Sequence, residues 1–277
     1  MQLIHAIILG IVEGVTEFLP ISSTGHLTIA EKLLGYQVDA ISITAFTAVV
    51  QVGAIAAAIV YFRKDIVRIA KGWWIGLTKP SKRGNDYWMG WYVVIGTAPI
   101  AVVGLLFRHI IENSLRGLWV VAIGLIFWSI VMFVADRVGR ETRKEHEVTW
   151  KDALFIGVMQ CVALIPGVSR SGATISAGLF RNIDRVTATR LSFFLGIPAL
   201  LAAGGLQAVS YAGQISEHVG WLSMSVGIMV SFIVGYIAIA WLLKFVSHHN
   251  FTPFIVYRIV LGAGIIAVLI AGMSVSL

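Results

Sequence analysis

Long runs of apolar residues, separated by short polar stretches, dominate the pattern of this chain. Six of these runs are long enough to cross about 30 Å of hydrocarbon as helices. They lie near residues 41–62, 89–107, 117–135, 188–210, 221–245 and 254–275. The pattern therefore predicts an all-α integral membrane protein with six transmembrane helices.

Two further apolar segments, about 3–34 and 152–180, are broken in the middle by Pro, Gly and Ser. A helix over residues 3–34 would be about 48 Å long, which is too short for two full crossings and a turn. We therefore predict that both segments are re-entrant helical hairpins whose polar tips lie within the membrane. Irregular backbone at that depth is tolerated only where protein or a water-filled cavity satisfies it.

The two broken segments resemble each other at a constant offset of 147 residues, from Ala6 to Ala153. This offset aligns AIILGIVE, which ends at Glu13, with ALFIGVMQ, which ends at Gln160. It also aligns SSTG with SRSG, and no gap is needed. The match indicates an internal repeat.

Each half of the chain, about 1–136 and 150–277, then holds one hairpin and three spans. Because three is an odd number of crossings, the second half is inverted relative to the first. Inverted repeats usually place their site near the midplane, where broken helices meet. We treat residues 1–277 as one membrane domain with this inverted-repeat arrangement.

The composition agrees with a membrane protein and changes how the net charge is interpreted. Hydrophobic residues make up 58% and charged residues 13%, with a mean hydropathy of +0.87, against roughly 45–50% and 25% in soluble domains. The net charge of +7 suggests nucleic-acid binding at first sight, but Lys and Arg gather in short loops between apolar runs. That is the positive-inside pattern, so we expect the lipid bilayer and no nucleic acid as a partner.

Loop charges predict the orientation of the chain. Lys and Arg are frequent in 63–88, 136–151 and 181–190, whereas 211–220 has none and 108–116 has two Arg. The first three loops are therefore expected on the cytoplasmic side, with the other two loops and both termini outside. The first hairpin then enters from outside and the second from the cytoplasm, so that their tips can meet.

The first broken segment carries a dense group of ionisable and hydroxyl side chains. Glu13 and Glu17 are four residues apart and so share one helix face, and Pro20 ends that helix. The group continues with Ser22, Ser23, Thr24 and His26. An ionisable group inside a membrane costs about 2.5 kcal/mol or more, so such groups mark functional sites.

The second broken segment reads PGVSRSGAT from Pro166 to Thr174. A helix that begins after this break presents unpaired N–H groups, which favour an anion. Arg170 adds a fork of donors that matches phosphate, and Ser169, Ser171 and Thr174 add hydroxyls. The pattern indicates a site for a phosphate ester or anhydride. The alternative is that Arg170 pairs with Glu13 or Glu17 merely to neutralise it.

Four motifs together resemble the bacterial undecaprenyl-diphosphate phosphatases, the bacitracin-resistance family. They are the ExxxE of Glu13 and Glu17, PISSTGH (Pro20–His26), PGxSRSxxT (Pro166–Thr174) and PFxxYR (Pro253–Arg258). The resemblance implies a multi-pass enzyme of the bacterial inner (plasma) membrane that removes the terminal phosphate of undecaprenyl diphosphate. It would thereby recycle the lipid carrier of peptidoglycan synthesis and confer bacitracin resistance, with a polyprenyl diphosphate as substrate and a site open to the outer side.

The candidate site residues have two sets of roles. The catalytic set is Glu13, Glu17, Ser23, His26 and Arg170, and the diphosphate-binding set is Ser22, Thr24, Ser169, Arg170, Ser171, Gly172 and Thr174. Phosphoryl transfer needs an in-line nucleophile, neutralised oxygens and a stabilised leaving group. We favour Ser23 as nucleophile, with Glu17 and His26 handling protons, and a base role for His26 toward the nearby Ser23 is plausible.

Several alternatives stay open at this point. His26 can itself attack or can protonate the leaving group. Glu13 and Glu17 can share a proton and act as base, or they can hold Mg²⁺ or Ca²⁺ against the diphosphate. No organic cofactor is expected, and a homodimer is a further possibility for the assembly.

Two rival classes are less consistent with the sequence. Phosphatases of the phosphatidic-acid type need an Arg-Pro pair and a His where this chain has Ser176, so that class is rejected. A lipid carrier is the second rival, because inverted repeats with broken helices are common in transporters. The cluster of Glu, Ser and His favours an enzyme, and phosphate release by the purified protein separates the two. Arg258, near the start of the last span, is expected to snorkel or pair locally.

Overall fold

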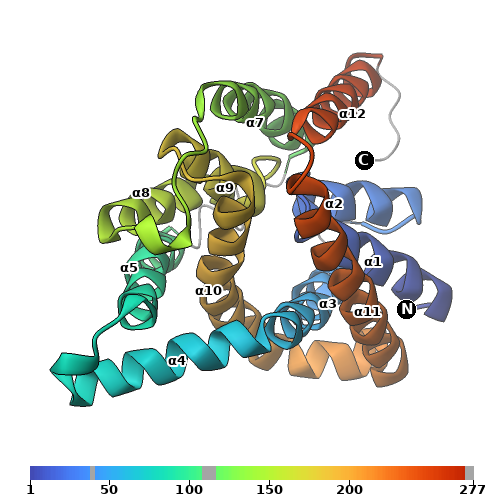
Figure 1. Ribbon diagram of the computed structural model, residues 1–277. Helices are drawn as coiled ribbons and strands as arrows, with labels where there is room; N and C mark the ends of the chain where they lie inside the picture. The colour runs from blue at the N-terminus through green and yellow to red at the C-terminus, as the bar shows by residue number, and fades with distance from the viewer. Residues whose placement is uncertain (38–40, 108–116, 272–277) are drawn as a thin grey trace.

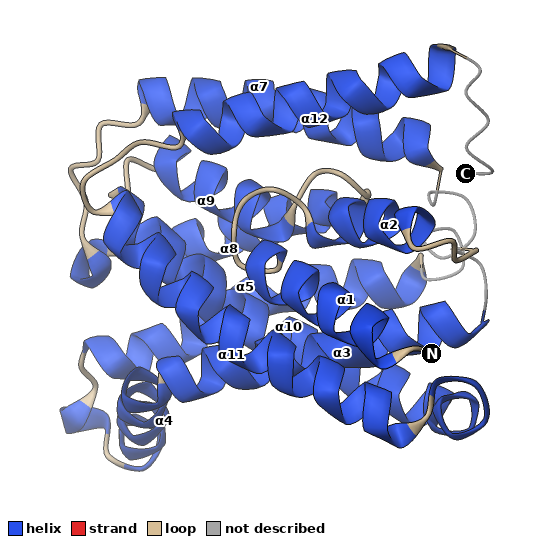
Figure 2. Cartoon of the chain, turned by 90° about the vertical axis from the view of Figure 1, so that its right-hand side faces the viewer, coloured by secondary structure: helices blue, strands red, loops and turns tan. Residues whose placement is uncertain are grey.

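The structure, a computed structural model, describes residues 1–37, 41–107 and 117–271, and over these residues it contains helices and no strands (Figure 2). Among the described residues, six helices have the length and apolar composition of membrane spans. They are α3 (Ile41–Tyr61), α5 (Asn85–Leu106), α7 (Leu118–Val138), α10 (Arg185–Gln214), α11 (Trp221–Val246) and α12 (Thr252–Ile270). The all-α membrane class and its six spans are thus confirmed. The predicted loop 108–116 and the C-terminal end lie outside the described residues.

Both broken segments consist of two short helices joined by irregular backbone. The first contains α1 (Leu3–Thr16) and α2 (Ser23–Leu33), and the second contains α8 (Trp150–Gln160), the short turn η3 (Cys161–Leu164) and α9 (Arg170–Phe180). The longest of these helices has 14 residues, about 21 Å, which is less than the hydrocarbon thickness. Re-entry from opposite sides and the inverted repeat stay predictions.

Ser22 and Ser169 mark the two breaks with the same unusual backbone. Their φ angles are 78° and 75°, in the region that residues other than glycine rarely adopt. Each precedes a helix and accepts a hydrogen bond on its side chain, from the N–H of Gly25 at 3.4 Å and of Gly172 at 3.3 Å. Serine is a favoured residue at this position because its oxygen satisfies a free N–H of the first turn.

Close helix packing places the broken segments against the spans. Helix α1 lies along α11, and α7 and α12 lie side by side along one edge of the molecule (Figures 1 and 2). A Cβ atom added to Gly10 would lie 2.7 Å from the carbonyl oxygen of Gly227, and one added to Gly14 would lie 2.8 Å from that of Ser231. These two glycines therefore allow α1 to approach α11.

The connection 63–88, predicted as a loop, contains a helix. Helix α4 (Arg63–Thr78) and the short turn η1 (Pro80–Lys82) precede α5, and α4 crosses the end of the bundle in Figure 1. Ile69 and Gly76 on α4 are buried, and α4 packs against α5. The prediction was wrong because the many Lys and Arg residues obscured the helical spacing of the apolar ones.

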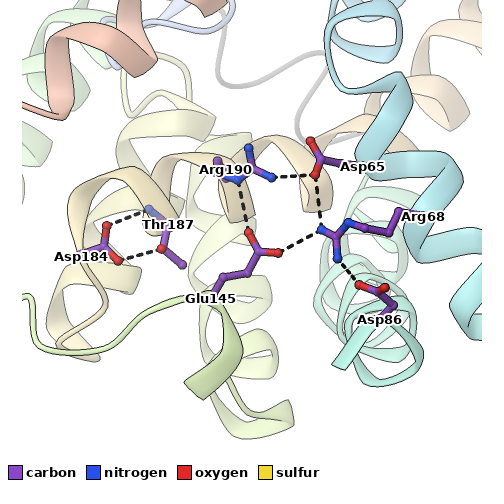
Figure 3. Close-up of polar contacts among 7 residues, drawn as sticks. All are labelled: Asp65, Arg68, Asp86, Glu145, Asp184, Thr187 and Arg190. Atoms are coloured by element: carbon purple, nitrogen blue, oxygen red, sulfur yellow. Dashed lines mark hydrogen bonds and ion pairs between the residues drawn. The ribbon is translucent and has the colours of Figure 1, made fainter. Parts of the chain in front are cut away.

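A group of ion pairs joins α4 to the 136–151 loop and α10 (Figure 3). Arg68 contacts Asp65, Asp86 and Glu145, and Arg190 lies 2.9 Å from Asp65 and 3.2 Å from Glu145. Glu145 belongs to a short turn, η2 (Glu145–Glu147). These pairs are partly exposed and each is weak, but together they fix the turn against two helices.

Candidate active site

Ser23 and Glu17 meet across the break between α1 and α2. The hydroxyl of Ser23 donates a hydrogen bond of 2.8 Å to Glu17 Oε2, and the Glu17 side chain is buried. A serine hydroxyl needs an adjacent base to become a nucleophile. Glu17 is in position to take the Ser23 proton, so the pair can begin a displacement reaction.

Arg170 binds the other oxygen of the same carboxylate. Its Nη2 donates to Glu17 Oε1 at 3.2 Å, and its Nη1 donates to the Ser192 carbonyl at 3.0 Å. Its Nε is buried without a partner among the described residues. Arg170 therefore neutralises Glu17, and its Nε donor is not used within the described residues. The ion pair of Arg170 with Glu17, considered above as the alternative role of Arg170, is present. This pair is compatible with a further role of Arg170 in binding an anion.

The hydroxyls of the second tip are bonded within the protein. Ser171 donates to the Leu19 carbonyl at 3.0 Å, and its oxygen lies 3.1 Å from Ser169 Oγ. Thr174 Oγ1 is 2.8 Å from the Arg170 carbonyl and 2.7 Å from Ser192 Oγ. In this arrangement these hydroxyls hold the second tip against the first tip and α10. To contact a diphosphate as predicted, they would have to exchange these protein partners for phosphate oxygens.

The imidazole of His26 is hydrogen-bonded to residues other than Ser23 and Glu17. Its Nδ1 is 2.8 Å from the Ser22 carbonyl oxygen and its Nε2 is 2.6 Å from the Tyr257 hydroxyl. Ser23 is hydrogen-bonded to Glu17 instead. The structure thus gives the nearby Ser23 a carboxylate as its proton acceptor, rather than the imidazole three residues on.

A cavity of about 220 Å³ opens beside these groups. The predicted residues Glu13, Ser23 and Thr24 line it, and Pro166 brings the second tip to its wall. Glu13 is 1% exposed, and its Oε1 has no hydrogen-bond partner among the described residues. The cavity therefore brings the Glu13 carboxyl group and the candidate nucleophile to one space.

Sequence reasoning missed much of the polar wall of this cavity. The additional polar lining residues include Thr28, Thr47, Gln51 and Gln207. Thr47 and Gln51 are four residues apart on α3, so they share a helix face. This polar stripe within an apolar run was the signal that could have identified the wall.

Arg258 is a correction to the expectation of a snorkelling side chain. It is 0% exposed and donates to the carbonyls of Pro20 at 3.1 Å, Gly167 at 2.9 Å and Val168 at 3.1 Å. Its Nε also donates to Ser129 Oγ at 3.0 Å. The sequence placed Arg258 near a span end, but the start of α12 lies beside both broken segments. Arg258 therefore ties the two tips together.

Glu13 fits a divalent cation better than Glu17 does. Both oxygens of Glu17 already have partners, whereas Glu13 Oε1 has none among the described residues. Over the residues that the structure describes, no three or more His, Cys, Asp or Glu side chains gather in an arrangement that could hold a metal ion. Mg²⁺ commonly binds through one or two carboxylates together with substrate phosphates, which a single carboxylate beside hydroxyls and an amide allows.

Comparisons with known proteins agree with the motifs. The sequence model of the family described as bacitracin resistance protein BacA matches residues 6–264. Undecaprenyl-diphosphatase 3 of Frankia casuarinae is 53% identical over 274 residues, which cover 99% of each chain. The undecaprenyl-diphosphatases of Cutibacterium acnes and Acidothermus cellulolyticus are 55% and 50% identical, again over 99% of each chain.

Proposed function

This chain belongs to the BacA family of bacitracin resistance proteins, and on that premise we propose that it hydrolyses undecaprenyl diphosphate to undecaprenyl phosphate and inorganic phosphate. The reaction recycles the lipid carrier used in peptidoglycan synthesis, and bacitracin resistance follows from it. The lipid bilayer is the environment of a multi-pass protein with six apolar spans. The relatives named above carry the same activity in their names.

The Ser23–Glu17–Arg170 contact is the observation that carries this proposal. Ser23 Oγ attacks the terminal phosphorus while its proton passes to Glu17 Oε2, which lies 2.8 Å away. An Oγ–P bond forms, and the bond from phosphorus to the bridging oxygen breaks, which releases undecaprenyl phosphate. Arg170 pairs with the Glu17 carboxylate, and its guanidinium supplies positive charge near the developing negative charge.

Water then hydrolyses the phosphoserine and restores the Ser23 hydroxyl. His26 suits this second step, because it lies three residues after Ser23 and so on the same side of α2. As a neutral imidazole, it accepts the proton that water loses on attack. Both steps balance: Glu17 returns the proton taken in the first step to the Ser23 oxygen as the Oγ–P bond breaks, and His26 passes the proton taken from water to the inorganic phosphate.

A divalent cation is the cofactor that these residues would accept. Glu13 Oε1 would bind Mg²⁺ or Ca²⁺ beside the hydroxyls of Ser23 and Thr24, which line the same cavity. The cation would supply neutralisation of the diphosphate oxygens. Glu17 is the less suitable ligand, because Ser23 and Arg170 occupy its oxygens.

The orientation follows from the loop charges. With basic loops on the cytoplasmic side, the cavity beside α2 and α3 opens toward the outer face of the bacterial plasma membrane. Ser22, Thr24, Ser169, Ser171, Gly172 and Thr174 frame the diphosphate in this proposal, and a homodimer is a further proposed assembly. The 63–88 and 136–151 segments would then lie in the cytoplasm.

The direct test is phosphate release by the purified full-length protein in detergent. We expect undecaprenyl phosphate and inorganic phosphate in equal amounts from undecaprenyl diphosphate. Ser23→Ala should abolish release, whereas Ser210→Ala, an exposed serine on α10, should leave it unchanged. Lipid transfer across vesicles without any phosphate release would instead identify a carrier.

A further inference from the structure

Tyr257 on α12 contacts His26 in two ways. Its hydroxyl lies 2.6 Å from His26 Nε2. The two rings are also stacked, with centroids 5.5 Å apart and planes inclined by 14°. The hydrogen bond fixes the direction of one ring nitrogen and the stacking fixes the ring plane, so together they set the orientation of the imidazole.

The hydrogen bonds also identify which nitrogen of His26 carries the proton. Nδ1 lies 2.8 Å from the Ser22 carbonyl oxygen, and a carbonyl oxygen can only accept. Nδ1 of the neutral ring is therefore protonated. Nε2 is then the acceptor, and Tyr257 donates its hydroxyl proton to it. Ser22 thus fixes the tautomer, and Tyr257 is the hydrogen-bond donor to Nε2, the ring nitrogen that carries no proton.

The position of Tyr257 is fixed by its neighbour in the chain. Arg258 donates to the carbonyls of Pro20 and Gly167, one in each broken segment. Helix α12 is therefore held against both tips at the residue that follows Tyr257. A shift of the α12 backbone at Tyr257 would therefore also strain the hydrogen bonds of the buried Arg258 guanidinium.

We propose that Tyr257 is a positioning residue that acts on the phosphatase reaction through His26. This inference rests on the proposed function for its kinetic consequence, but the contact itself does not. Tyr257→Phe keeps the ring and removes the donor to Nε2, so the imidazole loses one of its two fixed hydrogen bonds. We expect kcat to fall about tenfold, a part of what a positioned acid–base group contributes. KM should change by less than about twofold, because catalysis through His26, and not substrate binding, depends on the contact.

A double-mutant cycle separates positioning from general support of the fold. Tyr257→Phe should lower kcat in the wild-type protein and have no further effect in a His26→Gln protein. Tyr36→Phe is a matched control, because Tyr36 makes an equivalent hydrogen bond of 2.7 Å to His5 Nδ1 away from the site. Equal losses from Tyr257→Phe in both backgrounds would overturn the inference.

A second measurement does not depend on turnover. In the full-length protein labelled with ¹⁵N-histidine, the His26 signals are assigned by their loss in His26→Gln. They should show a protonated Nδ1 and an unprotonated, hydrogen-bonded Nε2. Tyr257→Phe should shift the Nε2 resonance, and Tyr36→Phe should shift only a resonance of His5. No hydrolysis by the wild-type protein would overturn the proposed function, whereas an Nε2 resonance unmoved by Tyr257→Phe would overturn the positioning role.

Discussion

The guanidinium of Arg170 lies 3.2 Å from the carboxylate of Glu17, although 153 positions separate the two residues in the chain. This contact joins the first broken segment to the second and leaves Glu17 Oε2 for Ser23. A buried pair of this kind is costly to break, because it leaves one charge without compensation. The candidate nucleophile, its base and the cation that holds the base are therefore one connected unit.

Arg170→Lys tests whether the shape of the cation matters. Lysine keeps the charge but cannot reach the Glu17 carboxylate and the Ser192 carbonyl with one planar fork. We expect phosphate release to fall by about 100-fold or more. Arg137→Lys, at an exposed arginine, is the control and should leave the rate unchanged. Near-normal turnover in Arg170→Lys would remove Arg170 from the mechanism.

Rapid quenching during turnover, followed by mass mapping, tests the nucleophile. We expect phosphate on Ser23, because its hydroxyl already donates to Glu17. Glu17→Gln should slow phosphoenzyme formation, since an amide cannot take the proton. Phosphate found on His26 would transfer the role of nucleophile to the imidazole, and full activity of Ser23→Ala would exclude Ser23 altogether.

Removal of the Arg258 side chain should destabilise the protein. Arg258→Met keeps much of the volume but leaves the carbonyls of Pro20, Gly167 and Val168 without their donor. We expect a loss of about 3 kcal/mol or more, because each buried carbonyl left without a donor costs about 1 kcal/mol or more, seen as a lower Tm in detergent together with lost activity. Arg137→Met serves as the exposed control. A Tm equal to that of the wild type would show that the two tips do not depend on this residue.

Cation dependence tests the assignment of Glu13. Treatment with a chelator should stop phosphate release, and Mg²⁺ or Ca²⁺ should restore it. Glu13→Gln should raise the cation concentration needed for half-maximal activity, because the ligand loses its charge. Glu141→Gln, at a loop carboxylate outside the cavity, should respond like the wild type. Full activity in the presence of chelator would contradict the proposed cation.

Accessibility labelling of single cysteines tests the orientation. In a Cys161→Ala background, Lys79→Cys and Arg140→Cys should be labelled only from the cytoplasmic side. Glu217→Cys should be labelled from outside, because the 211–220 segment has no Lys or Arg. Labelling of Glu217→Cys and Lys79→Cys from the same side would refute the topology that loop charges predict.

The six spans could be predicted from the sequence, because the hydropathy of about 20 consecutive residues determines whether a helix is stable in the hydrocarbon core. The sequence was also sufficient for the two breaks, where Pro20 and the Pro166–Gly167 pair interrupt the helices. Helix α4 was not predicted, because its many Lys and Arg side chains suggested a solvated loop. In the structure its apolar residues pack on α5.

The partners of each polar group could not be predicted in the same way. The hydroxyls of Ser171 and Thr174 can bind a phosphate or a carbonyl equally well, and only the folded chain places Leu19 and Ser192 within their reach. The contact between His26 and Tyr257 spans 231 positions. No local pattern indicates such a pairing, because it depends on how α12 packs beside the tips.

The hydrogen bonds of Arg258 have a consequence for the order of biosynthesis. Pro20 and Gly167 emerge from the ribosome well before Arg258 does, and both tips lack their common donor until then. The nascent chain therefore inserts both polar tips before the helix that carries their common hydrogen-bond donor has been made. The site assembles only after α12 has been made and packed, so a chain whose synthesis is interrupted earlier carries all of the proposed catalytic side chains in an inactive, unlocked form.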